Sequence, residues 1–217
     1  MTSKRKGSKF ILNIILVLFA GGLFGLGSIA LWVATMRIPD LNSFEVRRVT
    51  ESTKIYDRTG SILLYDVHNS IRRTIIPFED ISRNIKNAAV AIEDAEFYQH
   101  HGIKPTAILR AFLVNLSSFS FSQGGSTITQ QVVKNSILTS ERNITRKLKE
   151  WVLSIKLEKV MDKDTILSIY LNESPFGGNI YGVEEASQSF FNKNASKLTI
   201  AESAYLASLL KAPTYYS

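Results

Sequence analysis

The 217-residue chain contains no cysteine, which excludes a disulfide framework and thiolate chemistry. Histidine is scarce too: His68, His100 and His101 are the only three, too few and too poorly spaced for a convincing metal site. The net charge is +7, but four positive charges fall within the first nine residues, so the remainder is only mildly basic. We expect no protein-held metal and no nucleic acid partner. The mildly basic charge of the remainder suits an anionic ligand or a lipid surface.

Charge is absent from residues 10–36, a run of 27 between Lys9 and Arg37. At about 1.5 Å per residue, such a helix is longer than the bilayer's hydrocarbon core of about 30 Å. The basic residues precede the run, so the positive-inside rule places the N-terminus in the cytoplasm. We predict a cytoplasmic tail at 1–9, a transmembrane helix at 10–36 and an outer stalk at 37–51. A cleaved signal peptide is the alternative, which the length of the run disfavours.

The sequence beyond residue 51 predicts a small β-hairpin entry followed by a mainly helical domain. Strand-like segments at Thr53–Tyr56 and Ser61–Tyr65 flank the turn sequence at 57–60. Arg72–Ile76 indicates a third short strand before Pro77. Apolar residues then recur at helical spacing. The predicted helices cover residues 84–97, 105–116, 127–138, 143–160, 163–172, 180–191 and 199–211.

Residues 112–123, with the sequence FLVNLSSFSFSQ, are apolar and aromatic but rich in serine. A helix end followed by a mobile loop has this composition. A lip that dips into a membrane surface has it as well. The composition alone leaves both interpretations open.

Glu93 and Asp94 follow an apolar run at 88–92. A carboxylate at the edge of such a run is partly desolvated, and desolvation makes a carboxylate a better general base. An ordinary helix end with exposed acids is the alternative. Phe97, His100 and Gly102 follow within eight residues of Asp94, and such a grouping of residue types is denser than expected by chance.

A glycine pair at 124–125 leads into a predicted helix start. Thr127 and Gln130 have the spacing of a capping box, and free backbone N–H groups at such a start can hold an anion. Spacings of three and four allow Gln130 and Gln131 to share a helix face with Lys134. A capped surface helix explains the same pattern without a ligand.

Arg146 and Lys147 are spaced to share a helix face with Glu150. A surface salt bridge is the simpler explanation, although a base ahead of an acid is the weaker order for helix stability. Taken with Glu93 and Lys134, the cluster suits glycosyl chemistry with a phosphate leaving group. One carboxylate would act as base, and the cations would hold the departing charge.

Five segments in a fixed order carry a resemblance to a known family. They are EDAEFYQHHG (93–102), GGSTITQQVVKN (124–135), RKLKE (146–150), KDTILSIYLNESPFGGNIYGVEEAS (163–187) and AESAYLASLLKAP (201–213). From about residue 52 onward the chain resembles the peptidoglycan glycosyltransferase family, the transglycosylase module of bifunctional penicillin-binding proteins and of monofunctional cell-wall glycosyltransferases. The resemblance implies a lysozyme-like, mainly α domain at 52–217 that lies outside a bacterial cell membrane. It also makes 112–123 the counterpart of a membrane-associated subdomain.

The resemblance implies polymerisation of lipid II into glycan strands, with inversion and release of undecaprenyl pyrophosphate. Glu93 matches the general base that takes the proton from the acceptor's 4-hydroxyl, and Glu150 matches the second important glutamate. Asp94 matches a motif residue with a more structural role. The full set of expected substrate-binding residues is Asp94, Ser126, Thr127, Gln130, Gln131, Lys134, Asn135, Arg146 and Lys147.

The expected partners are lipid II, the growing glycan chain, membrane lipid, and division or elongation proteins. The sequence requires no cofactor. By the resemblance, Mg²⁺ or Mn²⁺ is expected to assist by binding the substrate pyrophosphate. Three positions depart from the family pattern: Lys104, Ser168 and Pro175. Two alternatives remain. A lysozyme-like hydrolase is disfavoured by the cations, which suit a pyrophosphate donor, and a non-catalytic lipid II-binding scaffold is disfavoured by the two glutamates.

The chain ends without a transpeptidase segment, so its C-terminal end looks truncated. A fragment of a bifunctional protein and a short monofunctional enzyme both fit. Ser208 and Lys211 do have the Ser-x-x-Lys spacing of penicillin-binding serines, but Lys-Thr-Gly occurs nowhere in the chain. We interpret that spacing as accidental.

Overall fold

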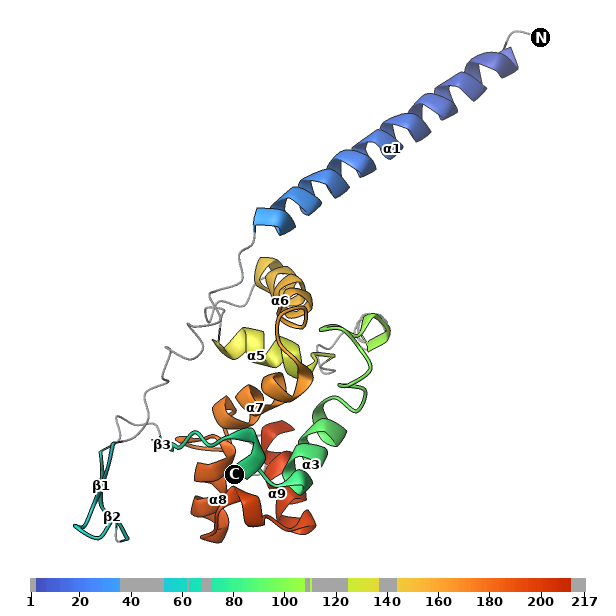
Figure 1. Ribbon diagram of the computed structural model, residues 1–217. Coiled ribbons are helices and arrows are strands. Elements are labelled where there is room, and N and C mark those ends of the chain that lie inside the picture. Colours follow the sequence, from blue (N-terminus) through green and yellow to red (C-terminus); the bar gives the residue numbers. More distant parts are fainter. Residues whose placement is uncertain are drawn as a thin grey trace. The chain divides into compact units, whose positions relative to one another are not determined.

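The computed structural model describes residues 3–35, 53–61, 63–67, 72–107, 110, 125–136 and 144–211. The chain divides into two compact units, Met1–Ile38 and Pro39–Ser217. The described part of the first unit is one helix, and that of the second is mainly helical with short strands (Figure 1). The predicted stalk at 37–51 and the lip at 112–123 lie outside the described residues.

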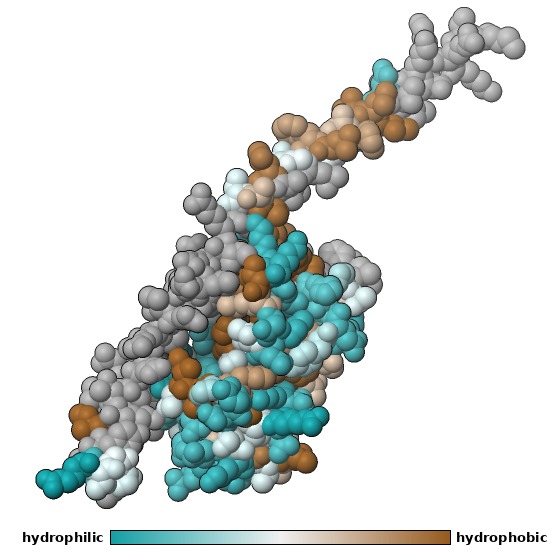
Figure 2. Space-filling model, viewed as in Figure 1, coloured by the Kyte–Doolittle hydropathy of each residue, from teal (hydrophilic) through white to brown (hydrophobic). Residues whose placement is uncertain are grey.

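The helix of the first unit, α1, spans Ser3–Thr35. Its large apolar side chains are exposed, among them Val17, Phe24 and Leu31, and apolar residues follow one another along it (Figure 2). The predicted helix is therefore confirmed. Within the part of the chain that the structure describes, no helix is both long and apolar enough to cross a membrane. The predicted membrane crossing by residues 10–36 is thus not confirmed.

The second unit opens with the predicted hairpin. β1 (Thr53–Tyr56) pairs antiparallel with β2 (Leu63–Val67), which begins two residues later than expected. The Gly60 N–H donates to the Asp57 carbonyl at 3.0 Å and closes the turn. Gly60 has φ +72°, a conformation that glycine adopts without the steric cost of a side chain.

The third predicted strand is corrected in length, and its partner is distant in sequence. β3 spans only Arg72–Arg73, not Arg72–Ile76. It pairs in parallel with β4 (Ile180–Tyr181), so it joins the far end of the chain and not the hairpin. Parallel pairing of segments so distant in sequence depends on tertiary packing, and no local pattern predicts it.

The helix predicted at 180–191 is also corrected, because its first residues form β4. Helix α8 begins only at Val183 and runs to Phe191. Gly182 separates the two elements with φ +82°, which lies outside the range of a right-handed helix. A Cβ atom at Gly182 would lie 2.7 Å from the Asn172 carbonyl oxygen, so the position also requires glycine for space.

The other predicted helices within the described ranges agree with the sequence in type. They are α3 (Arg83–Glu93), α5 (Ile128–Ser136), α6 (Ile144–Leu157), α7 (Lys163–Glu173) and α9 (Ile200–Lys211), with short 3-10 turns η1 (Phe78–Asp80) and η2 (Ala195–Lys197). The predicted helix at 105–116 falls mostly outside the described residues. α3 ends four residues earlier than expected, because Asp94 has φ −157° and ψ 74° and leaves the helix.

The buried core lies between the helices of the second unit. α3 packs against α9, and α5 packs against both α6 and α7. Figure 1 shows α3 and α9 side by side. Fully buried apolar side chains from these helices and their connections include Ile85, Phe97, Ile128, Leu157, Leu171, Phe176 and Leu206. Each such side chain contributes about 1.5–3 kcal/mol of apolar burial, so the core holds the ends of α3 and α5 in a fixed relation.

Candidate active site

Glu93 is the last residue of α3, and its side chain meets α5. The Gln131 amide nitrogen Nε2 donates to Glu93 Oε2 at 2.6 Å. The other oxygen, Oε1, is buried and has no hydrogen-bond partner in the described part of the chain. The carboxylate is therefore oriented through one oxygen, and the second oxygen remains able to accept a hydroxyl hydrogen.

Tyr170 of α7 lies near Glu93 and was not singled out by the sequence analysis. Its side chain is only 2% exposed. Burial, together with the negative charge of Glu93, raises the pKa of the Tyr170 phenol. The phenol therefore stays neutral beside the glutamate. In the sequence, Tyr170 shows only the apolar helical spacing of a core residue, and nothing in that spacing indicates a position near Glu93.

Asp94 is turned inward and is 4% exposed. Its Oδ2 lies 2.7 Å from His100 Nε2 and accepts the backbone N–H of Ile128, the first residue of α5, at 3.2 Å. Lys104 Nζ lies 4.0 Å from Asp94 Oδ1 and 3.1 Å from Glu96 Oε2. The start of α5 does hold an anion as predicted, but that anion is the protein's own carboxylate.

The predicted capping box at the start of α5 is confirmed. Thr127 N–H donates to Gln130 Oε1 at 2.8 Å, and Gln130 N–H donates to Thr127 Oγ1 at 3.2 Å. Thr127 Oγ1 also donates to the Gly102 carbonyl at 2.7 Å. Both capping residues are 1% exposed, whereas Lys134 is exposed. Gln130 therefore serves the helix start and is buried, whereas Lys134, four residues later on α5, is exposed.

Gly102 places the segment after α3 tightly against α6. It has φ +86°, and a Cβ atom there would lie 2.6 Å from the Ser154 carbonyl oxygen. Such a contact is far inside van der Waals distance, so a larger residue would displace the backbone. Through Gly102 and Thr127, the residues that follow Glu93 are fixed to both α5 and α6.

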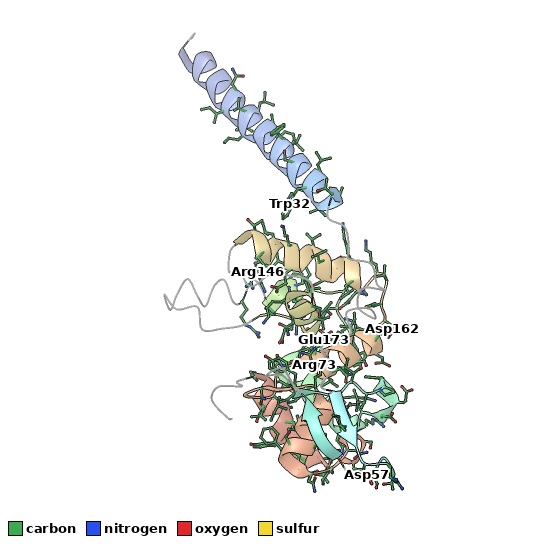
Figure 3. The ribbon with its side chains drawn as sticks, turned by 90° about the vertical axis from the view of Figure 1, so that its left-hand side faces the viewer. Trp32, Asp57, Arg73, Arg146, Asp162 and Glu173 are labelled. Carbon is green, nitrogen blue, oxygen red and sulfur yellow. The ribbon has the colours of Figure 1, made fainter. Side chains whose placement is uncertain are left out.

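Of the second predicted cluster, the pair formed by Lys147 and Glu150 is confirmed, and Lys147 also contacts the segment before α5. Lys147 Nζ forms an ion pair with Glu150 Oε1 three residues later and donates to Ser126 Oγ at 2.8 Å. Glu150 is 2% exposed, and Lys147 is partly exposed. Arg146 lies on the same helix, α6 (Figure 3). The ion pair and the bond to Ser126 fix Lys147 and Glu150 relative to each other.

The last turn of α5 carries the remaining predicted residues. Lys134 and Asn135 are exposed there. Ser136 Oγ donates to Glu173 Oε2, and this bond joins the last turn of α5 to the end of α7. α5 and the residues just before it thus contribute to every part of the candidate site. Ser126, ahead of the helix, contacts Lys147; Gln131 contacts Glu93; and Lys134 presents an ammonium group at the helix end.

Arg73 is a buried cation that the sequence analysis did not single out. It is 7% exposed, and its guanidinium lies 5.2 Å from the centre of the Tyr181 ring. Glu173 lies nearby (Figure 3), and burial lowers the pKa of Arg73 while Glu173 opposes that shift. The β3–β4 pairing that brings these residues together has no local sequence signal.

Two of the three departures from the family pattern, Ser168 and Pro175, lie on α7 or just after it. Ser168 lines a pocket of about 470 Å³ together with Phe78, Asp162, Asp164, Thr165 and Ile169. Pro175 forms an isolated bridge with Tyr181. Among the residues that the structure describes, no group of three or more histidine, aspartate or glutamate side chains is placed to hold a metal ion.

Comparison with known proteins defines the class. The transglycosylase family model matches residues 61–217, and the chain belongs to that family. Among similar proteins, penicillin-binding protein 1A of Rickettsia bellii is 40% identical over 210 residues, which cover 94% of this chain and 26% of that protein. Penicillin-binding protein 1A of Aquifex aeolicus is 41% identical over 207 residues, 95% of this chain and 28% of that protein.

Penicillin-binding protein 1A of Clostridium botulinum strain Langeland is 39% identical over 221 residues, which cover 98% of this chain. The match again covers 26% of the relative's length. The chain therefore spans about a quarter of the length of the relatives it matches. The expected family is confirmed.

Proposed function

We propose that this chain is a peptidoglycan glycosyltransferase of cell-wall synthesis that polymerises lipid II into glycan strands. Membership of the transglycosylase family supports the class of reaction. The single observation that carries the assignment of roles is the bond from Gln131 to Glu93 Oε2, while Oε1 has no donor among the residues that the structure describes. A carboxylate held in this way suits general-base catalysis.

In the proposed reaction, Glu93 takes the proton from the acceptor's 4-hydroxyl. The hydroxyl oxygen then forms a bond to C1 of the lipid-linked donor from the face opposite the leaving group. The bond from C1 to the pyrophosphate oxygen breaks with inversion, and undecaprenyl pyrophosphate leaves with the electron pair. The proton ends on Glu93, from which solvent removes it before the next cycle.

The proposed role of the cations is to stabilise charge as it develops on the departing pyrophosphate. Lys147 is fixed by Glu150 and Ser126, so it needs little rearrangement when that charge appears. Arg146, which directly precedes Lys147, and Lys134 on α5 would supply further positive charge. Because the pyrophosphate oxygens are good ligands for divalent ions, we propose that Mg²⁺ or Mn²⁺ acts through the substrate.

We further propose that residues 10–36 anchor the chain in a bacterial cell membrane, with the N-terminus in the cytoplasm and the domain at 52–217 outside. The uncharged run and the basic residues ahead of it support this placement. Expression in bacteria followed by alkaline extraction tests it. Recovery of the chain in the extracted supernatant would contradict anchoring, and protection of the outer domain from protease added to intact spheroplasts would contradict the orientation.

The function is tested by incubating the purified 217-residue chain with lipid II in detergent, with and without Mg²⁺. We expect glycan polymer on gels and release of one lipid pyrophosphate for each bond formed. Release of soluble muropeptides from purified sacculi without polymer formation would instead indicate a hydrolase. Saturable lipid II binding without turnover would indicate a scaffold.

A further inference from the structure

The Ser-x-x-Lys pair on α9 does not form a nucleophile and its base. Ser208 Oγ donates to the Tyr205 carbonyl within its own helix at 2.7 Å. Lys211 instead reaches across to α3, where Nζ donates to the carbonyl oxygen of Ile92 at 3.3 Å. The spacing noted in the sequence is thus accidental for acyl transfer, but its lysine has a defined contact.

That contact lies at the end of a helix, where carbonyl groups lack partners. The last four carbonyls of an α-helix have no intrahelical donor. In α3 the Asp94 N–H satisfies the Val90 carbonyl at 2.9 Å, and the Lys211 ammonium satisfies that of Ile92. A lysine at this end both hydrogen-bonds the carbonyl and complements the negative end of the helix dipole.

Ile92 directly precedes Glu93, so the bond from Lys211 acts on the backbone turn that carries the proposed base. Glu93 has a second restraint at its carboxylate, where Gln131 donates at 2.6 Å. The two restraints come from different helices, α9 and α5. Together they restrain the backbone just ahead of Glu93 and the carboxylate at the end of its side chain.

We infer that Lys211 is a positioning residue for Glu93, fixing the last turn of α3 from α9 so that the carboxylate points at the acceptor hydroxyl. This inference rests on the proposed glycosyl transfer. Lys211 acts through the backbone of Ile92 and needs no contact with substrate. Its loss therefore lowers the rate of the chemical step and leaves substrate binding in place.

The test compares Lys211→Met and Lys211→Arg with the wild-type chain in lipid II polymerisation. Lys159→Met is the matched control, because Lys159 is exposed in the turn that follows α6. We expect Lys211→Met to lower kcat by about three- to tenfold with KM unchanged, the effect of one charge at a helix end. Arginine retains the donor and the charge, so Lys211→Arg restores the rate to within about twofold of wild type.

Hydrogen exchange supplies a readout that does not depend on turnover. We expect amides at 91–97 to exchange faster in Lys211→Met, while amides elsewhere in α9 and the melting temperature stay as in Lys159→Met. A wild-type kcat for Lys211→Met, or a change confined to KM, overturns the inference and leaves the proposed function intact. General loosening of α3 and α9 also overturns it. An inactive wild-type chain overturns the proposed function and this inference together.

Discussion

The two glutamates of the candidate site are held in opposite ways. Glu93 receives a neutral amide donor, Gln131, on one oxygen, and its other oxygen has no hydrogen-bond partner within the described ranges of the chain. Glu150 is 2% exposed and is paired with the ammonium group of Lys147. Both arrangements are built around α5 and the residues just before it, since Gln131 and Ser126 supply one contact to each.

The difference indicates a division of labour. A general base must be able to gain and lose a proton during each cycle, so a neutral donor on one oxygen is suitable. A buried carboxylate that forms an ion pair orients its cation, so the ammonium group of Lys147 is held in place for an anion. The following four changes test that contrast, from the largest expected effect to the smallest.

Glu93→Gln removes the proposed base while keeping the shape and the hydrogen bonding of the side chain. We expect polymerisation of lipid II to fall by about 10²–10⁴-fold, the usual contribution of general-base catalysis, with an unchanged melting temperature. The control is Glu96→Gln, an exposed glutamate three residues later. Polymer formation at the wild-type rate by Glu93→Gln would assign the base elsewhere.

Lys147→Met leaves the buried Glu150 carboxylate without its cation. We expect unfolding free energy, measured by urea titration, to fall by about 1–3 kcal/mol and polymerisation to fall with it. The double variant with Glu150→Gln should recover much of the stability but not the activity, because the cation stays absent. Recovery of both would mean that the pair serves stability alone. The same cycle at Lys193 and Glu202, whose carboxylate is more exposed than that of Glu150, should show a smaller coupling between the two changes.

Gln131→Ala removes the amide that donates to Glu93 Oε2 but leaves the carboxylate itself. We expect about tenfold lower kcat with little change in stability, because Gln131 is partly exposed and orients the base. Gln99→Ala, at an exposed glutamine in the segment after α3, is the control. A fall in kcat as large as that of Glu93→Gln would instead show that the amide itself takes part in the reaction.

Glu202→Gln extends the comparison to a carboxylate far from catalysis, in a capping box at the start of α9. Hydrogen bonds from Lys193 and then from Thr199 lower the pKa of Glu202 to about 2 from its ordinary 4.5. A depressed pKa stabilises the fold above pH 4.5, and this contribution is lost as pH falls toward 2.

The melting temperature of Glu202→Gln should therefore lie slightly below wild type at pH 6, with the gap closing as the pH falls through that range. Polymerisation at neutral pH should be unchanged. Glu79→Gln, an exposed glutamate of η1, is the control. A gap that stays constant with pH would contradict the role assigned to the charge.

Local patterns predicted much of the second unit correctly. The hairpin followed from turn chemistry, and the capping box at Thr127 and Gln130 followed from spacing alone, because both are set by neighbours in sequence. The helix predicted at 180–191 failed at its start, because β4 gains its hydrogen bonds from β3 more than a hundred residues earlier. Helical periodicity cannot report a partner that is distant in sequence.

The sequence by itself determined the family, the order of the motifs and the Lys147–Glu150 contact, since three-residue spacing on a helix fixes that geometry. Only the tertiary structure decided which carboxylate each donor meets. Packing of α5 against its neighbours turned Asp94 inward onto the helix start and brought Gln131 to Glu93. Packing of α9 against α3 likewise brought Lys211 to Ile92. These contacts join residues that are far apart in sequence, and burial of a shared core brings them together.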